Sequence, residues 1–106
     1  MTDKRIVLTN CGSREEAEKI ARSLVENRLA ACVNIIPAMH SVYRWEGKVE
    51  EADEVLLVAK SRAEQFEALR KFVIAMHSYK CPMIVATPVT AGHQPYLDWV
   101  AQETVR

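Results

Sequence analysis

Glycine is scarce in this sequence, and the familiar enzyme motifs are missing. Only three glycines occur among 106 residues, and none belongs to a phosphate-binding loop, a dinucleotide fingerprint or a G-x-S-x-G element. The metalloprotease pattern H-E-x-x-H is missing as well. We therefore expect a protein that binds or assembles, and not an enzyme.

Charge of one sign is not in excess. Fourteen Lys and Arg residues balance fourteen Asp and Glu residues, so no net field attracts nucleic acid or an anionic membrane. No apolar run approaches the length of a membrane span, and residues 1–5 are not followed by the apolar region of a signal peptide. We expect no nucleic-acid partner, no membrane partner and a cytoplasmic location.

Cysteine is present in an odd number. Cys11, Cys32 and Cys81 stand at spacings that fit no disulfide framework and no C-x-x-C pair, which predicts free thiols in a reducing compartment. With 49% hydrophobic residues, the chain can bury a core without disulfides or a structural metal. We expect residues 1–106 to form a single domain.

The first segment has the pattern of a buried strand followed by a helix. Residues 5–11 contain an apolar run that ends before Gly12. Ser13 and Glu16 form a capping-box sequence, in which each side chain can satisfy an amide at the helix start. The apolar stripe that should face the sheet is Ala17, Ile20, Ala21 and Leu24.

Residues 30–60 predict one long β-hairpin around the turn Glu46-Gly47. Each arm of about fifteen residues would span about 50 Å, whereas a chain of this size has a radius of gyration of about 13 Å. The tip should therefore overhang the domain, and another subunit is the expected cover for its apolar residues and free edges. A sharp bend or bulge at Pro37 is the alternative. Without a bulge, the pairs are His40 with Asp53, Met39 with Glu54, and Ile35 with Val58.

The second half repeats the plan of the first. Ser61 and Glu64 again form a capping-box sequence. Residues 83–89 are almost entirely apolar, which predicts a strand buried on both faces. Pro95 suits the first turn of a last helix. The two expected apolar stripes are Phe66, Leu69, Val73 and Met76, and then Leu97, Val100, Ala101 and Thr104.

The resulting order is strand, helix, strand, strand, helix, strand, and a terminal helix, which is the split βαβ plan. Right-handed crossovers place both long helices on one face of an antiparallel four-stranded sheet. The predicted fold class is α+β, a ferredoxin-like βαββαβ sandwich with a long hairpin between its second and third strands and an extra C-terminal helix.

Five segments of the sequence form a distinctive combination. They are residues 29–34 (LAACVN), residues 41–48 (SVYRWEGK), Glu54 with residues 56–60 (LLVAK), residues 77–82 (HSYKCP), and Gly92 with residues 96–99 (YLDW). This combination resembles the CutA divalent-cation tolerance family, which has a His-Pro-Tyr-x-x-Pro stretch where this chain has residues 77–82. The resemblance implies a ferredoxin-like fold, a tight homotrimer joined through the long hairpins, and a link to copper and other divalent cations. The family is also similar in architecture to the PII signalling proteins, whose trimers bind small ligands between subunits.

Some positions depart from the family pattern. Ser78 stands where the family usually has proline, and Met83 stands where it usually has an acidic residue. The copper-linked cysteine of some bacterial members is similar in position to Thr9 here, with Cys11 two residues further on. Some bacterial members have also been linked to copper through histidines that precede the tyrosine motif, and of these only His77 is present here. The loss of a carboxylate at Met83 weakens the expectation of a hard-cation site.

Thiolate and imidazole groups suit copper. No two of the candidate groups stand at a recognised metal spacing, and Cys32 lies in an Ala-Val-rich strand where core packing is the simpler explanation. His77 and Cys81 flank the loop between a helix and a strand, which makes these two the better candidates. His40 opposite Asp53 is either a metal ligand oriented by a carboxylate or a surface contact. The candidate copper ligands are His77, Cys11, Cys81 and Cys32.

The family resemblance also implies a ligand cleft between subunits. Its candidate residues are Lys48, Glu54, Lys60, Tyr79, Tyr96 and Trp99. Alternatively, Glu54 and Lys60 pair across the subunit boundary, and the aromatic residues anchor the subunit contact.

The sequence thus predicts a homotrimeric divalent-cation tolerance protein that binds copper or another divalent cation weakly. Its expected partners are further copies of itself and metal ions. The alternative is a PII-like signalling trimer that binds a small anion or metabolite near Lys48, Glu54 and Lys60. Assembly without any ligand is a third interpretation.

Overall fold

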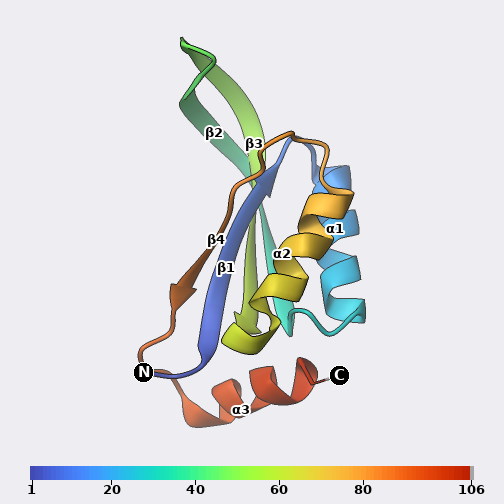
Figure 1. The fold of residues 1–106 in the computed structure, drawn as a ribbon, viewed down its shortest axis with the longest axis vertical. Coiled ribbons are helices and arrows are strands. Elements are labelled where there is room, and N and C mark those ends of the chain that lie inside the picture. The colour runs from blue at the N-terminus through green and yellow to red at the C-terminus, as the bar shows by residue number, and fades with distance from the viewer. Residues whose placement is uncertain (106) are drawn as a thin grey trace.

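The computed structural model describes residues 1–105, which form a four-stranded antiparallel sheet in the order β2-β3-β1-β4. Figure 1 shows α1 and α2 on one face of this sheet and α3 across its lower end, near the N-terminus. The elements are β1 (Lys4–Cys11), α1 (Arg14–Glu26), β2 (Cys32–Trp45), β3 (Lys48–Arg62), a 3-10 turn (Ala63–Gln65), α2 (Phe66–Met76), β4 (Ile84–Pro88) and α3 (Gln94–Glu103). The predicted ferredoxin-like fold class is confirmed. No helix within residues 1–105 is long and apolar enough to cross a membrane.

Helix α1 begins and ends with side-chain and backbone caps. The Ser13 hydroxyl accepts a hydrogen bond from the Glu16 N–H at 3.1 Å, which is one half of the predicted capping box. The Glu16 carboxylate, expected to form the other half, accepts hydrogen bonds from Ser78 instead. At the other end Arg28 adopts a left-handed backbone with φ of 58°, and the N–H of Leu29 donates to the Leu24 carbonyl at 2.9 Å. This cap turns the chain into β2. All four residues of the predicted stripe are buried.

The hairpin has the predicted turn, but one strand carries a bulge. Glu46 and Gly47 both have positive φ, 50° and 81°, which suits a two-residue hairpin turn. The pairs His40 with Asp53 and Met39 with Glu54 are confirmed. The pair Ile35 with Val58, expected only if no bulge intervened, does not form, because Ile35 pairs with Leu57. The bulge considered at Pro37 is present. The register shifts by one residue between Ile36 and Met39, where Ala38 adopts φ of 64°.

The hairpin extends beyond the rest of the sheet. The last pair between β1 and β3 is Cys11 with Val55, so residues 48–54 of β3 lie past the end of β1. Figure 1 shows this part projecting above the helices and curling at its tip. The longest dimension of the molecule is 44 Å and its radius of gyration is 14.3 Å. Curling makes the hairpin shorter than a straight ribbon of the same length.

The prediction of a second capping box at Ser61 and Glu64 is wrong. Ser61 belongs to β3, and its buried hydroxyl donates to the Leu29 carbonyl at 2.7 Å. A 3-10 turn follows before α2 begins at Phe66. Within α2, the stripe residues Leu69 and Val73 are fully buried, whereas Met76 is 36% exposed. A tertiary hydrogen bond thus competes with the local cap at Ser61.

Strand β4 is an edge strand, which corrects the prediction that it is buried on both faces. It pairs only with β1 within the described residues, over five residue pairs. Val85 is 46% exposed. A nearly unbroken apolar run therefore indicates here a surface that the single chain leaves uncovered.

The two faces of the sheet differ in their cover. Val7, Leu57 and Ala59 belong to the core cluster with the helices. Their neighbours in sequence point to the opposite face, which carries no helix. Its central apolar side chains, only partly buried, are Ile6, Leu8, Leu56 and Val58.

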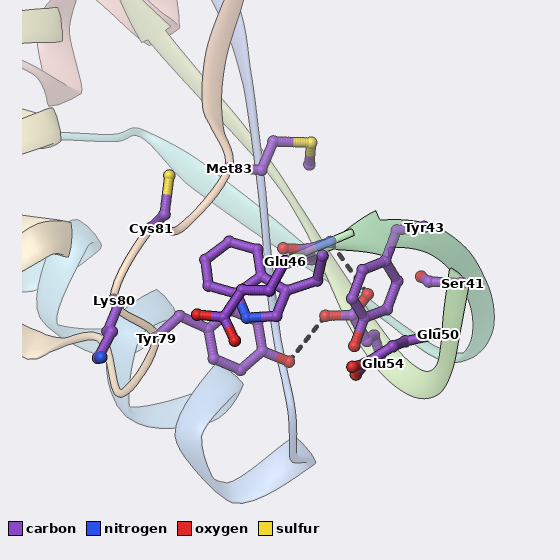
Figure 2. Close-up of a pocket in the computed structure, with 11 residues that line it drawn as sticks. Ser41, Tyr43, Glu46, Glu50, Glu54, Tyr79, Lys80, Cys81 and Met83 are labelled. Carbon is purple, nitrogen blue, oxygen red and sulfur yellow. Dashed lines mark hydrogen bonds between the residues drawn. The ribbon is translucent and has the colours of Figure 1, made fainter. Parts of the chain in front are cut away.

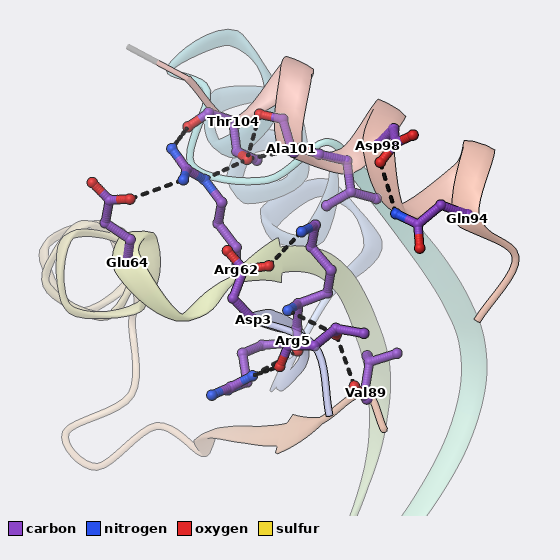
Figure 3. Close-up of polar contacts among 12 residues, drawn as sticks. Asp3, Arg5, Arg62, Glu64, Val89, Gln94, Asp98, Ala101 and Thr104 are labelled. Atoms are coloured by element: carbon purple, nitrogen blue, oxygen red, sulfur yellow. Dashed lines mark hydrogen bonds and ion pairs between the residues drawn. The ribbon is translucent and has the colours of Figure 1, made fainter. Parts of the chain in front are cut away.

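Helix α3 is held against the end of the sheet by polar contacts. Arg62 donates through Nε to the Thr104 hydroxyl at 3.0 Å and through Nη2 to the Thr104 carbonyl at 3.1 Å. Figure 3 shows its guanidinium between Thr104 and Glu64. Pro95 lies in the first turn of α3, as predicted. Thr104, Leu97 and Val100 are buried, so the last helix closes the lower end of the core.

Candidate functional site

A cavity of about 650 Å³ lies between the hairpin and the loop from α2 to β4. Figure 2 shows hairpin residues on one side of it and loop residues on the other. Its acidic and aromatic lining residues are Glu46, Glu50, Glu54, Tyr43, Trp45 and Tyr79. The others are Asn10, Ser41, Lys80, Cys81 and Met83.

Strand alternation explains why the hairpin side chains converge. Ser41, Tyr43 and Trp45 are alternate residues of β2 and therefore share one face. Tyr43 pairs with Glu50, so this carboxylate stands beside its ring on the same face. The curl of the hairpin turns that face toward the loop from α2 to β4 (Figure 2).

Glu54 is the buried anchor of the cavity. It is 8% exposed, and its Oε2 accepts a 2.7 Å hydrogen bond from the Tyr79 hydroxyl. Its Oε1 accepts a longer hydrogen bond, of 3.4 Å, from the side-chain amide of Asn10. Burial, together with the hydrogen bond to Glu54, raises the pKa of Tyr79 well above its ordinary value. The phenol therefore stays a proton donor at neutral pH, and it fixes the orientation of the Glu54 carboxylate.

His77 contacts two residues of the cavity lining, Asn10 and Tyr79, and both of its ring nitrogens are engaged. Its side chain is 0% exposed, and Nδ1 accepts a hydrogen bond from the Tyr79 N–H at 3.1 Å. The proton of the neutral ring is therefore on Nε2, which donates to the Asn10 carbonyl at 2.6 Å. In this arrangement His77 offers no free lone pair to a metal. Its role as a copper ligand stays a prediction.

Glu16 joins α1 to the same loop. Its carboxylate accepts hydrogen bonds from the Ser78 N–H at 2.8 Å and the Ser78 hydroxyl at 3.1 Å. Burial opposes ionisation, but these hydrogen bonds outweigh it and lower the pKa of Glu16. Ser78, a departure from the family pattern, thus has a structural partner here.

The three cysteines lie in different environments. Cys11 is fully buried, and burial, followed by the charges of Glu16 and Glu54, raises the pKa of its thiol to about 11. Cys32 is half-buried, with its Sγ 4.0 Å from the Lys60 ammonium. Cys81 is exposed and lines the cavity. Within residues 1–105, no three His, Cys, Asp or Glu side chains gather as a metal site.

Thr9 adds no ligand to this set. Its side chain is 1% exposed, and its hydroxyl is the buried side-chain oxygen without a hydrogen-bond partner in residues 1–105. The position that resembles a copper-linked cysteine thus lies under the helices.

The six predicted cleft residues do not meet in one chain. Glu54 and Tyr79 are in contact at the cavity, whereas Lys48 lies at the hairpin tip. Lys60 lies near the opposite end of β3 from Lys48. The ring centroids of Tyr96 and Trp99 on α3 lie 5.6 Å apart, with the ring planes tilted by 40°. Burial, followed by the charge of Cys32, raises the pKa of Tyr96. A shared cleft that draws on several subunits stays a prediction.

Tyr43, Glu46 and Glu50 line the cavity but are not among the site residues predicted from the sequence. The signal was available, because the turn fixes the register and the register puts Tyr43 opposite Glu50. What the sequence did not reveal is the curl that brings this face over Tyr79 (Figure 2).

The chain is similar over almost its whole length to known proteins. The family model described as "CutA1 divalent ion tolerance protein" matches residues 5–103. The divalent-cation tolerance protein CutA of Thermus thermophilus is 46% identical over 101 residues, which are 95% of this chain and 98% of that protein. Its solved structure superposes with a TM-score of 0.95 and covers 96% of this chain.

Two further relatives come from other kinds of organism. The CutA of Archaeoglobus fulgidus is 50% identical over 93 residues, which are 88% of this chain and 89% of that protein, and its structure, described as periplasmic, gives a TM-score of 0.93. The chloroplastic CutA of Arabidopsis thaliana is 43% identical over 99 residues. The match spans 93% of this chain and 54% of the plant protein.

Proposed function

The chain belongs to the CutA1 divalent ion tolerance family, and from that premise we propose that it acts as a homotrimer that binds copper or another divalent cation weakly. The protein acts by binding and not by catalytic turnover. Family membership is the observation that carries the metal function, because the related proteins are named for divalent-cation tolerance.

The uncovered face of the sheet supports the assembly. Ile6, Leu8 and Val58 form an apolar centre on a face without helices, and soluble single chains rarely leave such a patch in water. The projecting part of the hairpin has no β1 partner for β3, so both of its edges are free to pair. Packing of these surfaces between copies of the chain would cover the apolar patch and pair the free strand edges.

The environment of each sulfur ranks the candidate copper donors. Cys81 is exposed, and Cys81 and Met83 both line the cavity, so two residues with soft donors for Cu(I) stand two positions apart in the sequence. Cys11 is buried and protonated at neutral pH, and His77 would have to release the Tyr79 N–H. We therefore propose Cys81 as the main donor, which agrees with weak binding.

The three free thiols also support a reducing compartment. We propose a cytoplasmic location for this chain. Relatives carry chloroplastic and periplasmic descriptions, so the location is a property to be measured for each protein.

Calorimetric titration tests the metal function. Cu(I) under reductant and Cu(II) are titrated into the wild type and into Cys81→Ser, His77→Ala and Cys32→Ser. We expect saturable Cu(I) binding that weakens at least tenfold in Cys81→Ser and is unchanged in Cys32→Ser. Copper binding that is absent, or equal in all variants, contradicts the assignment.

A further inference from the structure

We propose that Cys32 and Lys60 form an oxidation-sensitive lock at the base of the hairpin. In the oxidised state a nitrogen–sulfur bond joins their side chains and therefore joins β2 to β3. This inference goes beyond metal tolerance and does not depend on it. It rests on the pairing of the two residues in the sheet and on the contact between their side chains.

The strand register brings the two side chains together. Cys32 is directly opposite Lys60 in the antiparallel pair of β2 and β3, and directly opposite side chains share one face of the sheet. The Cys32 Sγ lies 4.0 Å from the Lys60 Nζ. Both residues lie at the end of the sheet next to α3, away from the projecting part of the hairpin (Figure 1). The pair belongs to a single chain, so every copy contains it.

Within residues 1–105, Lys60 has no carboxylate partner. None of the ion pairs there includes Lys60, and the Cys32 sulfur is the one side-chain hydrogen-bonding contact of its ammonium. The amine can therefore turn toward the sulfur without breaking an ion pair. The flexible four-carbon stem of lysine lets Nζ close the remaining distance without a shift of either strand.

The position of the pair keeps it within reach of small oxidants. Lys60 lies between the buried residues Ala59 and Ser61, so its side chain is on the face without helices. Lys60 and Cys32 are both half-buried there, beyond the apolar centre at Val58. Covering an ammonium that has no partner costs a large desolvation free energy, so the pair belongs at the rim of the face that other copies cover. Hydrogen peroxide, which is hardly larger than water, reaches such a rim.

No second thiol of the same chain competes for an oxidised Cys32. Cys11 is fully buried at the end of β1, where it pairs with Val55. Cys81 lines the cavity beside the projecting hairpin, toward the other end of β2. A sulfenic acid at Cys32 therefore meets the Lys60 amine first.

The chemistry needs one molecule of hydrogen peroxide. The Cys32 thiol, reacting as its thiolate, breaks the O–O bond, and the products are a sulfenic acid and water. The Lys60 amine, after its ammonium proton has gone to solvent, attacks the sulfur. The N–S bond forms, the S–O bond breaks, and the departing hydroxide takes a proton from the nitrogen. In total, one thiol, one amine and one peroxide give a sulfenamide and two waters, and the sulfur loses two electrons to the peroxide oxygens.

The link would fasten the hairpin at its base. It joins positions 28 residues apart, and the segment between them contains both arms and the turn. A cross-link of this kind restricts the unfolded chain, so the oxidised protein should unfold at a higher urea concentration. Because the two residues are already paired, the folded sheet keeps its register.

Peptide mass spectrometry of the assembled full-length protein tests the proposal. The wild type, Lys60→Arg and Cys32→Ser are treated with hydrogen peroxide in EDTA, which keeps metal ions out of the reaction. Lys48→Arg, at the other end of β3, is the matched control. A parallel set of samples contains dimedone, which traps sulfenic acids. Each sample is digested with trypsin before and after treatment with dithiothreitol.

We expect a linked pair of peptides, residues 29–44 and 49–62, whose mass is their sum less two hydrogen atoms. Dithiothreitol should separate the pair, because it reduces the N–S bond to thiol and amine while it forms its own disulfide. The linked pair should form in Lys48→Arg and be absent in Lys60→Arg and Cys32→Ser.

Dimedone gives a second readout that does not depend on the linked peptides. Arginine keeps the charge of Lys60, but its guanidinium stays protonated and does not attack sulfur. Dimedone labelling of Cys32 should therefore rise at least threefold in Lys60→Arg. The proposal is overturned by a Cys32 that stays reduced, by a disulfide between copies, or by equal labelling of the wild type and Lys60→Arg, whatever the copper titrations give.

Discussion

The Tyr79 hydroxyl donates a 2.7 Å hydrogen bond to the buried Glu54 carboxylate, which joins the loop before β4 to the base of the hairpin. Both residues line the cavity (Figure 2). The same tyrosine packs against the turn after β1, because a Cβ added at Gly12 would lie 3.2 Å from the Tyr79 hydroxyl. Tyr79 is therefore a structural centre of the candidate site.

Tyr79→Phe should destabilise the protein by about 1.5–3 kcal/mol, because a hydrogen bond to a buried charged group is lost. Tyr96→Phe is the matched control, since Tyr96 is 42% exposed. It should change the free energy of unfolding by less than about 0.5 kcal/mol. Urea unfolding at one fixed protein concentration measures both variants, and equal effects would count against the role of Tyr79.

Thr9→Val should stabilise the protein by about 1 kcal/mol, because it removes a buried hydroxyl that has no hydrogen-bond partner. Thr104→Val makes the same chemical change where the hydroxyl accepts from Arg62 and donates to the Val100 carbonyl. That variant should lose about 1–3 kcal/mol. Thermal unfolding of the pair should therefore shift in opposite directions, and a loss of stability in Thr9→Val would show that its hydroxyl has a partner.

Ala38→Gly should stabilise the hairpin by about 0.5–1 kcal/mol. Ala38 forms the bulge with φ of 64°, a backbone conformation that glycine adopts without steric cost. Ala52, across the sheet in β3, is the control, because glycine within a regular strand should destabilise by a similar amount. Amide hydrogen exchange of the hairpin reports both changes. Slower exchange in Ala52→Gly than in Ala38→Gly would contradict the assignment of strain.

His40 should titrate above its ordinary pKa of 6.5, because hydrogen bonds to Asp53 and then Glu51 favour the charged ring. Since the pKa in the folded state is the higher one, the stabilising contact is complete below the unfolded pKa and is lost as pH rises through the folded pKa. An NMR titration should give a lower His40 pKa in Asp53→Asn than in the wild type. An unchanged pKa would show that the contact does not form in solution.

Local patterns in the sequence predicted most of the fold. The turn at Glu46-Gly47 fixed the register as far as Met39, because each further pair follows from the one before it. Beyond that point the register depended on whether a bulge lies at Pro37, and one extra residue at Pro37-Ala38 shifts every later pair, including that of Ile35, by one. Ser61 shows where local patterns failed, because its hydroxyl bonds to the distant Leu29 carbonyl instead of capping a helix.

The candidate site was less predictable. The family resemblance singled out Glu54 and Tyr79 separately, but their contact joins positions 25 residues apart and depends on the path of the loop. Tyr43 and Glu50 face the cavity only because the hairpin curls. Residue types alone also suggested His77 as a metal ligand, although both of its ring nitrogens have partners in the fold.

The central claim is that further copies of the chain cover the open face of the sheet and the hairpin. Sedimentation velocity at micromolar protein concentration tests it most directly. The account predicts a single species of about 36 kDa, three times the 12.0 kDa chain. A folded species of one chain mass at the same concentration would contradict it.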